Sequence, residues 1–199
     1  MNVGCIPSKF LLEAGNEYFY RQSPQFPCNL PGVARCDFPE AIANKDRMVR
    51  RLRRSSYEDV LRGRRIEAIE GRGTLLPGRQ VKVGSRRLEG RHVLVATGSM
   101  PRIPRIEGLA EAGYLTNRTL MQRTDRPNEL LVLGGGPTGL EFAQMYAHFG
   151  SAVTILESGP RLLPTEEPEV SEEITRCLRN EGLTVHVGVR VRRIDRKRG

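Results

Sequence analysis

The chain has 199 residues and a formal charge of +9, with 38% hydrophobic and 28% charged residues. This length allows one domain or two small ones. No run approaches the roughly 18 consecutive apolar residues of a membrane span, and no basic and then apolar leader opens the chain. We therefore expect a cytoplasmic protein that has no membrane partner.

Arginine supplies most of the positive charge, since only four of the 32 basic residues are lysine. The arginines are densest in Arg47–Arg65 and Arg190–Arg198, where they could contact nucleic-acid phosphates. However, aromatic residues make up only 6% of the chain and tryptophan is absent. We favour solvated basic faces over base-stacking surfaces, and we expect no nucleic-acid partner.

The first part of the chain reads as two helices and the next part as short strands. Apolar residues lie near helical spacing up to about residue 62, and toward a period of two from Ile66 to Thr97. Glycine and proline separate the short strands. The expected elements are the helix Lys9–Tyr20, the loop Pro24–Pro39, the helix Phe38–Leu61, and the strands Ile66–Ile69, Gly73–Leu76, Gln80–Val83 and His92–Ala96, followed by a connector at Pro101–Gly113.

Strands and helices alternate in the last part of the chain. This β-α-β-α-β order is typical of a parallel sheet and predicts an α/β fold. Gly150 suits the end of the first of these helices, because glycine is favoured just past a helix C-terminus. The expected elements are the strand Glu129–Leu133, the helix Thr138–Phe149, the strand Ala152–Leu156, the helix Glu169–Glu181 and the strand Leu183–Val187.

A glycine-rich turn, Gly134-Gly-Gly-Pro-Thr-Gly139, joins the first of these strands to its helix. Gly134 permits a tight turn, Gly136 lets the backbone approach a pyrophosphate, and Gly139 allows close packing of helix and strand. The helix N-terminus offers free N–H groups to phosphates. Because the turn follows a strand and opens a helix, we favour a dinucleotide site over a turn without a ligand.

Glu157 follows the second strand, where a carboxylate can accept both hydroxyls of an adenosine ribose. A 2′-phosphate would meet like charge there, so the sequence favours NADH over NADPH. Arg161 is the competing signal, because a nearby arginine can receive a 2′-phosphate.

Cys5 lies in the segment Asn2-Val-Gly-Cys-Ile-Pro-Ser-Lys9 at the start of the first helix. A helix N-terminus favours a thiolate and makes such a cysteine a better nucleophile and redox centre. Lys9 follows one turn later and can share that environment. The separations of 23, 8 and 141 between Cys5, Cys28, Cys36 and Cys177 match no zinc motif, so we expect no resident metal. The three later cysteines read as ordinary thiols in a reducing compartment.

Three motifs together resemble the FAD-dependent pyridine nucleotide–disulfide oxidoreductases, among them mercuric reductase, dihydrolipoyl dehydrogenase and glutathione reductase. They are NVGCIPSK at the active-site cysteine, His92-Val-Leu-Val-Ala-Thr-Gly-Ser99 at a flavin-contacting turn, and Leu133-Gly-Gly-Gly-Pro-Thr-Gly-Leu-Glu141 at the nicotinamide turn. The resemblance covers essentially the whole chain. It implies a partial FAD-binding domain at 1–114, without its N-terminal GxGxxG unit, and a partial Rossmann-type NAD(P)-binding domain at 115–199.

The resemblance also implies roles for individual residues. Cys5 corresponds to the redox cysteine next to the flavin, and Lys9 to the lysine at its reactive nitrogen, where a glutamate at the position of Glu141 meets it. Hydride would pass from NAD(P)H to FAD and electrons on to a disulfide, or the reverse. Implied flavin contacts are Lys9, Gly73, Thr97, Gly98 and Ser99; implied dinucleotide contacts are Gly134, Gly135, Gly136, Pro137, Thr138, Gly139, Glu141, Glu157 and Val191.

The family pattern extends beyond both ends of the sequence. Its motif is Cys-x-x-x-x-Cys, and the first cysteine would stand one place before Met1. The homodimerisation domain, with its His–Glu acid/base pair, would follow Gly199. We therefore expect the middle of a longer homodimeric enzyme and no turnover from this chain alone.

The substrate implied by the resemblance is a small molecule or a metal ion. The segment Phe38–Leu61 is most similar to mercuric reductases, which hold a soft metal ion with thiolates, and dihydrolipoyl dehydrogenase is the second choice. A non-catalytic module that keeps part of the NAD site is the remaining alternative.

Overall fold

The computed structural model describes residues 4–22 and 36–195. Several segments named above lie outside the described residues. They are Asn2 and Val3 of the cysteine motif, the greater part of the predicted Pro24–Pro39 loop with Cys28, and the last two arginines of the cluster Arg190–Arg198. Contacts divide the chain into two compact units, one formed by Met1–Arg50 with Ile103–Gly199 and the other by Arg51–Arg102. Across the described part of the chain, no helix is both long and apolar enough to cross a membrane.

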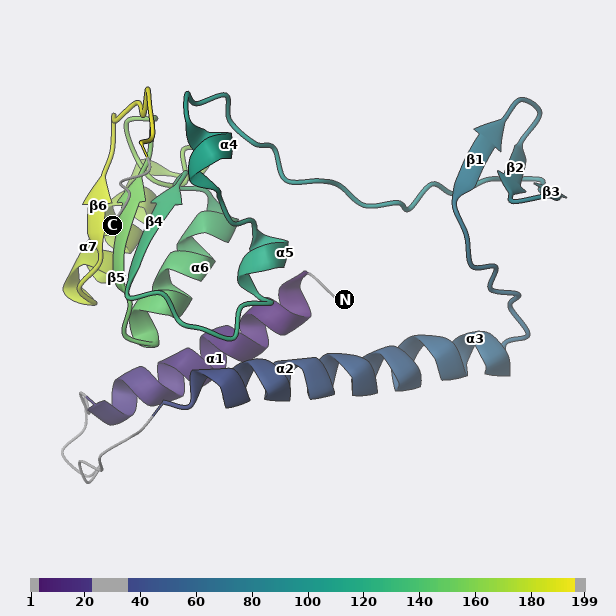
Figure 1. Ribbon diagram of the computed structural model, residues 1–199, viewed down its shortest axis with the longest axis horizontal. Coiled ribbons are helices and arrows are strands. Elements are labelled where there is room, and N and C mark those ends of the chain that lie inside the picture. Colours follow the sequence, from purple (N-terminus) through teal and green to yellow (C-terminus); the bar gives the residue numbers. More distant parts are fainter. Residues whose placement is uncertain (1–3, 23–35, 196–199) are drawn as a thin grey trace. The chain divides into compact units, whose positions relative to one another are not determined.

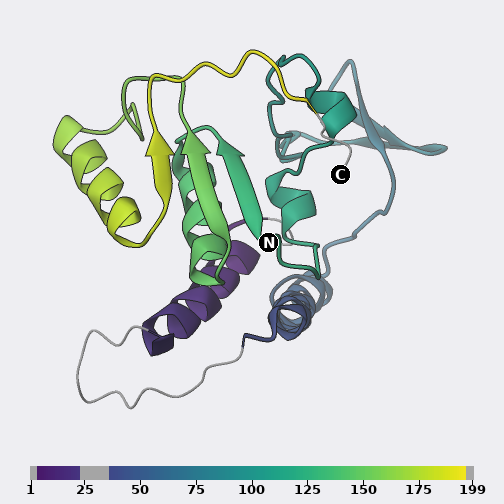
Figure 2. The ribbon, with the colours of Figure 1, turned by 60° about the vertical axis from the view of Figure 1, so that its left-hand side comes forward.

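The first unit contains a three-stranded parallel sheet in the order β4-β5-β6 (Figure 2). β4 (Glu129–Leu133) and β5 (Ala152–Leu156) have the bounds predicted from the sequence, and β6 (Thr184–His186) lies within its predicted range. The helix α6 (Pro137–His148) connects β4 to β5, and α7 (Pro168–Asn180) connects β5 to β6. The predicted β-α-β-α-β arrangement is confirmed.

The core of this unit forms around α6, which packs against β4 and β5 and also against α1 (Cys5–Gln22). Ala143, Met145 and Tyr146 of α6 are completely buried. Gly15 of α1 lies so close to α6 that an added Cβ would stand 3.2 Å from the carbonyl oxygen of Met145. The absence of a side chain at Gly15 therefore lets the two helices meet backbone to backbone.

Two further helices close the end of the core. The ring of Phe38, at the start of α2 (Phe38–Arg53), contacts Tyr146 and Phe149 with centroids 5.7 and 5.1 Å apart. The buried Lys45 donates from Nζ to the carbonyl of Met121 at 2.8 Å and pairs with Asp46 at 2.6 Å. These two bonds satisfy the buried ammonium and hold the segment after α5 (Asn117–Leu120) on α2.

A short helix, α4 (Leu109–Ala112), interrupts the predicted connector.

The second unit is a helical segment followed by an antiparallel meander. A π-helical turn, η1 (Arg54–Glu58), leads into α3 (Asp59–Gly63), so the predicted helix up to Leu61 continues in two pieces after α2. β1 (Gly73–Leu76) and β2 (Gln80–Val83) have their predicted bounds and pair with Gly73 opposite Val83. β3 (Arg86–Glu89) completes the order β1-β2-β3 (Figure 1).

Two predicted strands, Ile66–Ile69 and His92–Ala96, are wrong. Neither segment forms a helix or strand, and neither pairs with a strand among the described residues. Leu94 is 90% exposed and Ile66 is 52% exposed, so their apolar side chains are not packed on a sheet. An alternating sequence forms a strand only if a neighbouring strand is available for backbone hydrogen bonds. In this sheet the third strand is β3, whose sequence is mostly charged.

The buried hydroxyl of Tyr146 yields a stability prediction. It donates to the carbonyl of Leu120 at 2.9 Å, and burial raises the pKa of Tyr146, so the donor stays protonated. Tyr146→Phe leaves that carbonyl without its partner. We expect the free energy of unfolding to fall by about 1 kcal/mol in urea denaturation. Tyr114→Phe, at an exposed position, is the control and should change it by less than about 0.5 kcal/mol; equal losses would contradict this assignment.

Candidate functional site

The glycine turn lies between β4 and α6, as predicted, and leaves the helix N-terminus open. Gly134 has φ +110, in the region that favours glycine, and its N–H donates to the carbonyl of Leu156 at 2.9 Å. Gly136 is the N-cap of α6 with φ −81 and ψ 172, and Pro137 follows in the first turn. A Cβ on Gly134 or Gly136 would meet nothing within 4 Å. The space beside the first N–H groups of α6 therefore suits a phosphate group of a dinucleotide.

Two other glycines of the turn are needed for packing. A Cβ on Gly139 would stand 2.4 Å from the carbonyl oxygen of Gly134, a backbone atom that could not move aside alone. A Cβ on Gly135 would stand 2.5 Å from the Leu162 side chain. Gly139 and Gly135 thus let the helix and the following loop close on the turn, whereas Gly134 and Gly136 face open space.

Glu157 lies directly after β5 with its carboxylate against the turn. Its Oε2 accepts from the N–H of Gly135 at 2.6 Å, and its Oε1 accepts from the N–H of Gly159 at 2.5 Å. Burial raises the pKa of Glu157, but the N–H groups of Gly159 and Gly135 outweigh it, so the pKa is lowered. The group is ionised at neutral pH. Its Oε1 also accepts from the Ser158 hydroxyl at 3.3 Å, so Oε2 is the oxygen that keeps a lone pair for a ribose hydroxyl.

The loop after Glu157 includes two contacts that the sequence reasoning missed. Gly159 donates to Glu157, and the N–H of Leu163 donates to the carbonyl of Gly135 at 2.9 Å. The contact of Gly159 could have been predicted, because this glycine follows the acidic residue at the end of β5 by two positions. Arg161 donates from Nη2 to the carbonyls of Pro164 and Glu166 at 3.1 and 2.9 Å. These two bonds use Nη2 alone, and the buried Nε has no hydrogen-bond partner among the described residues.

Lys9 of α1 and Glu141 of α6 form an ion pair, with Nζ 2.6 Å from Oε1. The predicted contact between these two residues, which are 132 positions apart, is confirmed. The hydrogen bond and charge of Glu141 raise the pKa of Lys9. The side chains are 58% and 34% exposed, so the pair is accessible to a ligand. Cys5, also exposed, is the first residue of α1.

The other predicted site residues fall into two groups. Thr138 is exposed at the start of α6, and Val191 is half-buried in the extended segment after β6. The remaining four, predicted to contact a flavin, belong to the Arg51–Arg102 unit, where all are exposed. These are Gly73 at the start of β1, and Thr97, Gly98 and Ser99 in the extended segment after β3, with Gly98 at φ +73.

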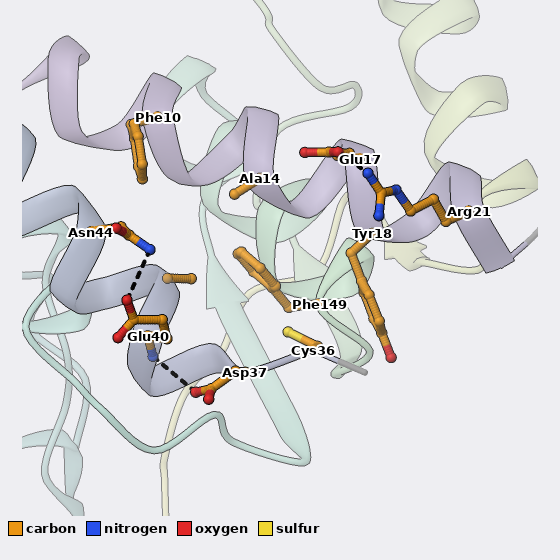
Figure 3. Close-up of a pocket in the computed structure, with 11 residues that line it drawn as sticks. Phe10, Ala14, Glu17, Tyr18, Arg21, Cys36, Asp37, Glu40, Asn44 and Phe149 are labelled. Atoms are coloured by element: carbon orange, nitrogen blue, oxygen red, sulfur yellow. Dashed lines mark hydrogen bonds and ion pairs between the residues drawn. The ribbon is translucent and has the colours of Figure 1, made fainter. Parts of the chain in front are cut away.

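An open pocket of about 470 Å³ lies between α1 and the start of α2 (Figure 3). Its apolar wall includes Phe10, Ala14 and Phe149. Charged groups at its rim are paired within the chain, Arg21 with Glu17 and Glu40 with Arg47. None of the predicted site residues is among the described residues that line it. Arg21 is the cation among the described lining residues, and its ion pair with Glu17 leaves it poorly placed to bind a phosphate. The candidate site remains the glycine turn with the Lys9–Glu141 pair.

Comparison with known proteins identifies the family. All of the chain, residues 1–199, matches the family described as pyridine nucleotide-disulphide oxidoreductase. The chain belongs to this family.

Individual relatives cover nearly all of the chain. It is 39% identical to the mercuric reductase of Streptomyces lividans, over 98% of this chain and 42% of that protein. It is 36% identical to the dihydrolipoyl dehydrogenase of Chlorobaculum tepidum, over 96% of this chain and 42% of that protein. A solved Cu(II) complex of the HOCl-induced flavoprotein disulfide reductase RclA from Escherichia coli matches with a TM-score of 0.83 at 29% identity, over 98% of this chain and 41% of that one. The chain thus spans about two fifths of the length of these relatives.

The contrast between the glycines gives a paired prediction. Gly139→Ala places its Cβ 2.4 Å from a backbone oxygen, so we expect a loss of several kcal/mol of stability, in the range of strained backbone and overpacking. Gly136→Ala adds its Cβ in open space at a φ that alanine accepts, so only the weaker suitability of alanine as an N-cap should act, and the free energy of unfolding should fall by about 1 kcal/mol or less. Thermal and urea unfolding of both variants measure this. Similar stabilities for the two would show that the turn is not packed as described.

Proposed function

We propose that the chain provides the nicotinamide-dinucleotide site and the Lys9 side of the flavin site of an oxidoreductase that moves electrons between NAD(P)H, FAD and a redox-active cysteine pair. The observation that carries the proposal is the 2.6 Å Lys9–Glu141 ion pair. It joins the helix that begins at Cys5 to the helix that begins at the glycine turn. A redox cysteine and a dinucleotide turn thereby become parts of one site.

The dinucleotide would lie across the N-terminus of α6. The open N–H groups after Gly136 would bind its pyrophosphate, and Glu157 would accept the ribose hydroxyls. The ionised Glu157 carboxylate would repel a 2′-phosphate, and the Arg161 guanidinium that could compensate already donates to two loop carbonyls. NADH is therefore the favoured cofactor.

FAD, when bound, supplies the acceptor for a hydride and passes electrons to sulfur. Lys9 would place a positive charge beside that acceptor, and Glu141 would keep the lysine protonated, because their contact raises the lysine pKa. Cys5 would act as a thiolate at the positive end of the α1 dipole. Gly73, Thr97, Gly98 and Ser99 are the proposed contacts from the partial FAD-binding domain, 1–114, and Val191 is a proposed contact in the partial NAD(P)-binding domain, 115–199.

The proposed acceptor is a metal ion, as the name of the Streptomyces lividans relative suggests, with a homodimer as the working form. Identity of 39% to that mercuric reductase against 36% to the Chlorobaculum tepidum dihydrolipoyl dehydrogenase supports this order. A small disulfide acceptor is the second candidate. A binding module without turnover, in which the glycine turn serves NADH alone, is the third.

The dinucleotide preference can be measured on this chain. We expect NADH fluorescence to rise on binding, and NADPH to bind about tenfold or more weakly, since a repelled charge next to Glu157 costs about 1.4 kcal/mol or more. Glu157→Gln removes the charge but keeps an oxygen acceptor. This variant should lose about threefold to tenfold in NADH affinity and most of its discrimination against NADPH.

Gly136→Ala is the matched control for this measurement. It should lose about 1 kcal/mol of stability at most but bind both dinucleotides weakly, because its methyl group would occupy the place of the pyrophosphate. Equal or tighter NADPH binding by the parent chain would refute the Glu157 assignment and make Arg161 the deciding residue.

The role of Cys5 can be tested in a protein that contains this chain together with the rest of the flavin site. Cys5→Ser should abolish NADH-dependent disulfide or metal-ion reduction, because a serine hydroxyl cannot carry the sulfur redox step. Transfer of electrons from NADH to an artificial dye through the flavin should persist. Cys177→Ser is the control and should keep both activities. Full disulfide reduction by the Cys5→Ser protein would show that the redox assignment is wrong.

A further inference from the structure

A second polar contact joins α1 to α6, beyond the Lys9–Glu141 pair. The ring of His148, at the last position of α6, lies with Nδ1 2.7 Å from Oδ1 of Asn16 in α1. Its Nε2 lies 3.1 Å from Oε2 of Glu181, the residue after α7. The His148 side chain is 1% exposed. A buried imidazole with both nitrogens hydrogen-bonded is held in one orientation.

The two α1–α6 contacts have the same spacing. Each joins residues 132 positions apart, Lys9 to Glu141 and Asn16 to His148. Along either helix the two contacts are thus two turns, or about 10 Å, apart. Residues at this spacing lie on the same side of a helix. The helices therefore run in the same direction with one common register.

The surroundings of His148 leave the ring little freedom. Phe19 of α1 stacks on it with centroids 4.2 Å apart and an interplanar angle of 11°. Glu181 is itself held, because the same Oε2 accepts from Nε2 of Gln144 at 2.7 Å. Between the two polar contacts, a Cβ on Gly15 would come within 3.3 Å of the His148 Cβ. Packing and polar contacts together locate α1 at this end of α6.

The contact can form with either charge state of the ring. A doubly protonated ring donates to Asn16 and to Glu181. A neutral ring donates to Glu181 and accepts from the Asn16 amide when that amide is turned round. Burial lowers the pKa of His148 and outweighs the raising effect of Glu181, so the neutral form prevails at neutral pH.

We propose that Asn16, His148 and Glu181 are positioning residues that set the register of α1 on α6 and so hold Lys9 against Glu141. A shift of one helical turn would move Lys9 by about 5.4 Å and take it beyond ion-pair distance. The importance of this register for catalysis rests on the proposed function, whereas the register itself can be tested without any cofactor.

The test is competitive acylation of the lysines with acetic anhydride, read by mass spectrometry. Only the free amine reacts, so the contact that raises the pKa of Lys9 slows its acylation. The chain has four lysines, and the exposed Lys82 is the internal reference. Glu141→Gln, which removes the partner charge, should accelerate Lys9 relative to Lys82 about two- to fivefold, the range of an exposed ion pair. The acceleration measured for Glu141→Gln is the reference with which the other variants are compared.

His148→Phe keeps an aromatic ring to stack on Phe19 but loses both hydrogen bonds. Asn16→Ala removes the α1 partner of His148 at a half-buried position. If His148→Phe does not fold, Asn16→Ala is the variant that decides the test. Both should accelerate Lys9 acylation by at least half of the Glu141→Gln effect. Asn16→Asp keeps an oxygen acceptor and should leave Lys9 slow. It should also raise the pKa of His148 in an NMR titration, a response that general packing would not produce.

Ile155→Val is the matched control. It loosens the buried core of β5 by an amount similar to a lost hydrogen bond, in a strand that packs mainly on β4, β6 and α6. It should leave Lys9 protected. The inference fails if Asn16→Ala and His148→Phe leave Lys9 slow, if Ile155→Val accelerates Lys9 equally, or if Glu141→Gln has no effect. Absence of NADH binding to the parent chain would count against the proposed function only, since the acylation experiment uses no dinucleotide.

Discussion

The direct packing of α1 against α6 is the constraint on which the rest of the site depends. α1 begins at Cys5 and α6 begins at the glycine turn, so chemistry at the two helix starts is coupled only if the helices keep one alignment. Gly15 allows the backbones to approach, and polar contacts lie at both ends of the shared surface. Two helix N-termini, each with its positive dipole end, consequently belong to one rigid assembly.

The glycines of the turn serve two different purposes, packing within the protein and access to the helix N-terminus. Gly139 and Gly135 are required because the protein itself fills the space where a side chain would be. Gly134 and Gly136 face open space, so neither crowding nor backbone strain requires glycine at Gly136, which has an ordinary φ. Glycine at Gly136 leaves the N-terminus of α6 open, and a phosphate-binding turn requires such an open helix N-terminus. This contrast supports a ligand more strongly than the motif does.

The sequence predicted the α/β region well because local pattern and tertiary environment agree there. β4 and β5 are short apolar runs between clear turn signals, and both bounds were correct. The prediction failed where a strand needs a neighbour: His92–Ala96 has the right alternation but no ladder among the described residues, whereas the charged β3 pairs with β2. The Lys9–Glu141 contact came from family resemblance. Nothing in the local sequence marks Asn16 and His148, because their partnership exists only once α1 lies on α6.

The two N–H bonds to Glu157 have a consequence for redesigning the cofactor preference. A carboxylate that only faced the solvent could be exchanged freely for a neutral or basic side chain. Here the same two oxygens also tie the glycine turn to the loop after β5 through Gly135 and Gly159. A glutamine could accept from only one of these two donors, and a basic side chain from neither, so a replacement that tolerates a 2′-phosphate leaves at least one buried N–H group without an acceptor. Changing the proposed preference toward NADPH without a loss of stability would therefore require rebuilding the loop from Ser158 to Leu163 together with the acidic residue.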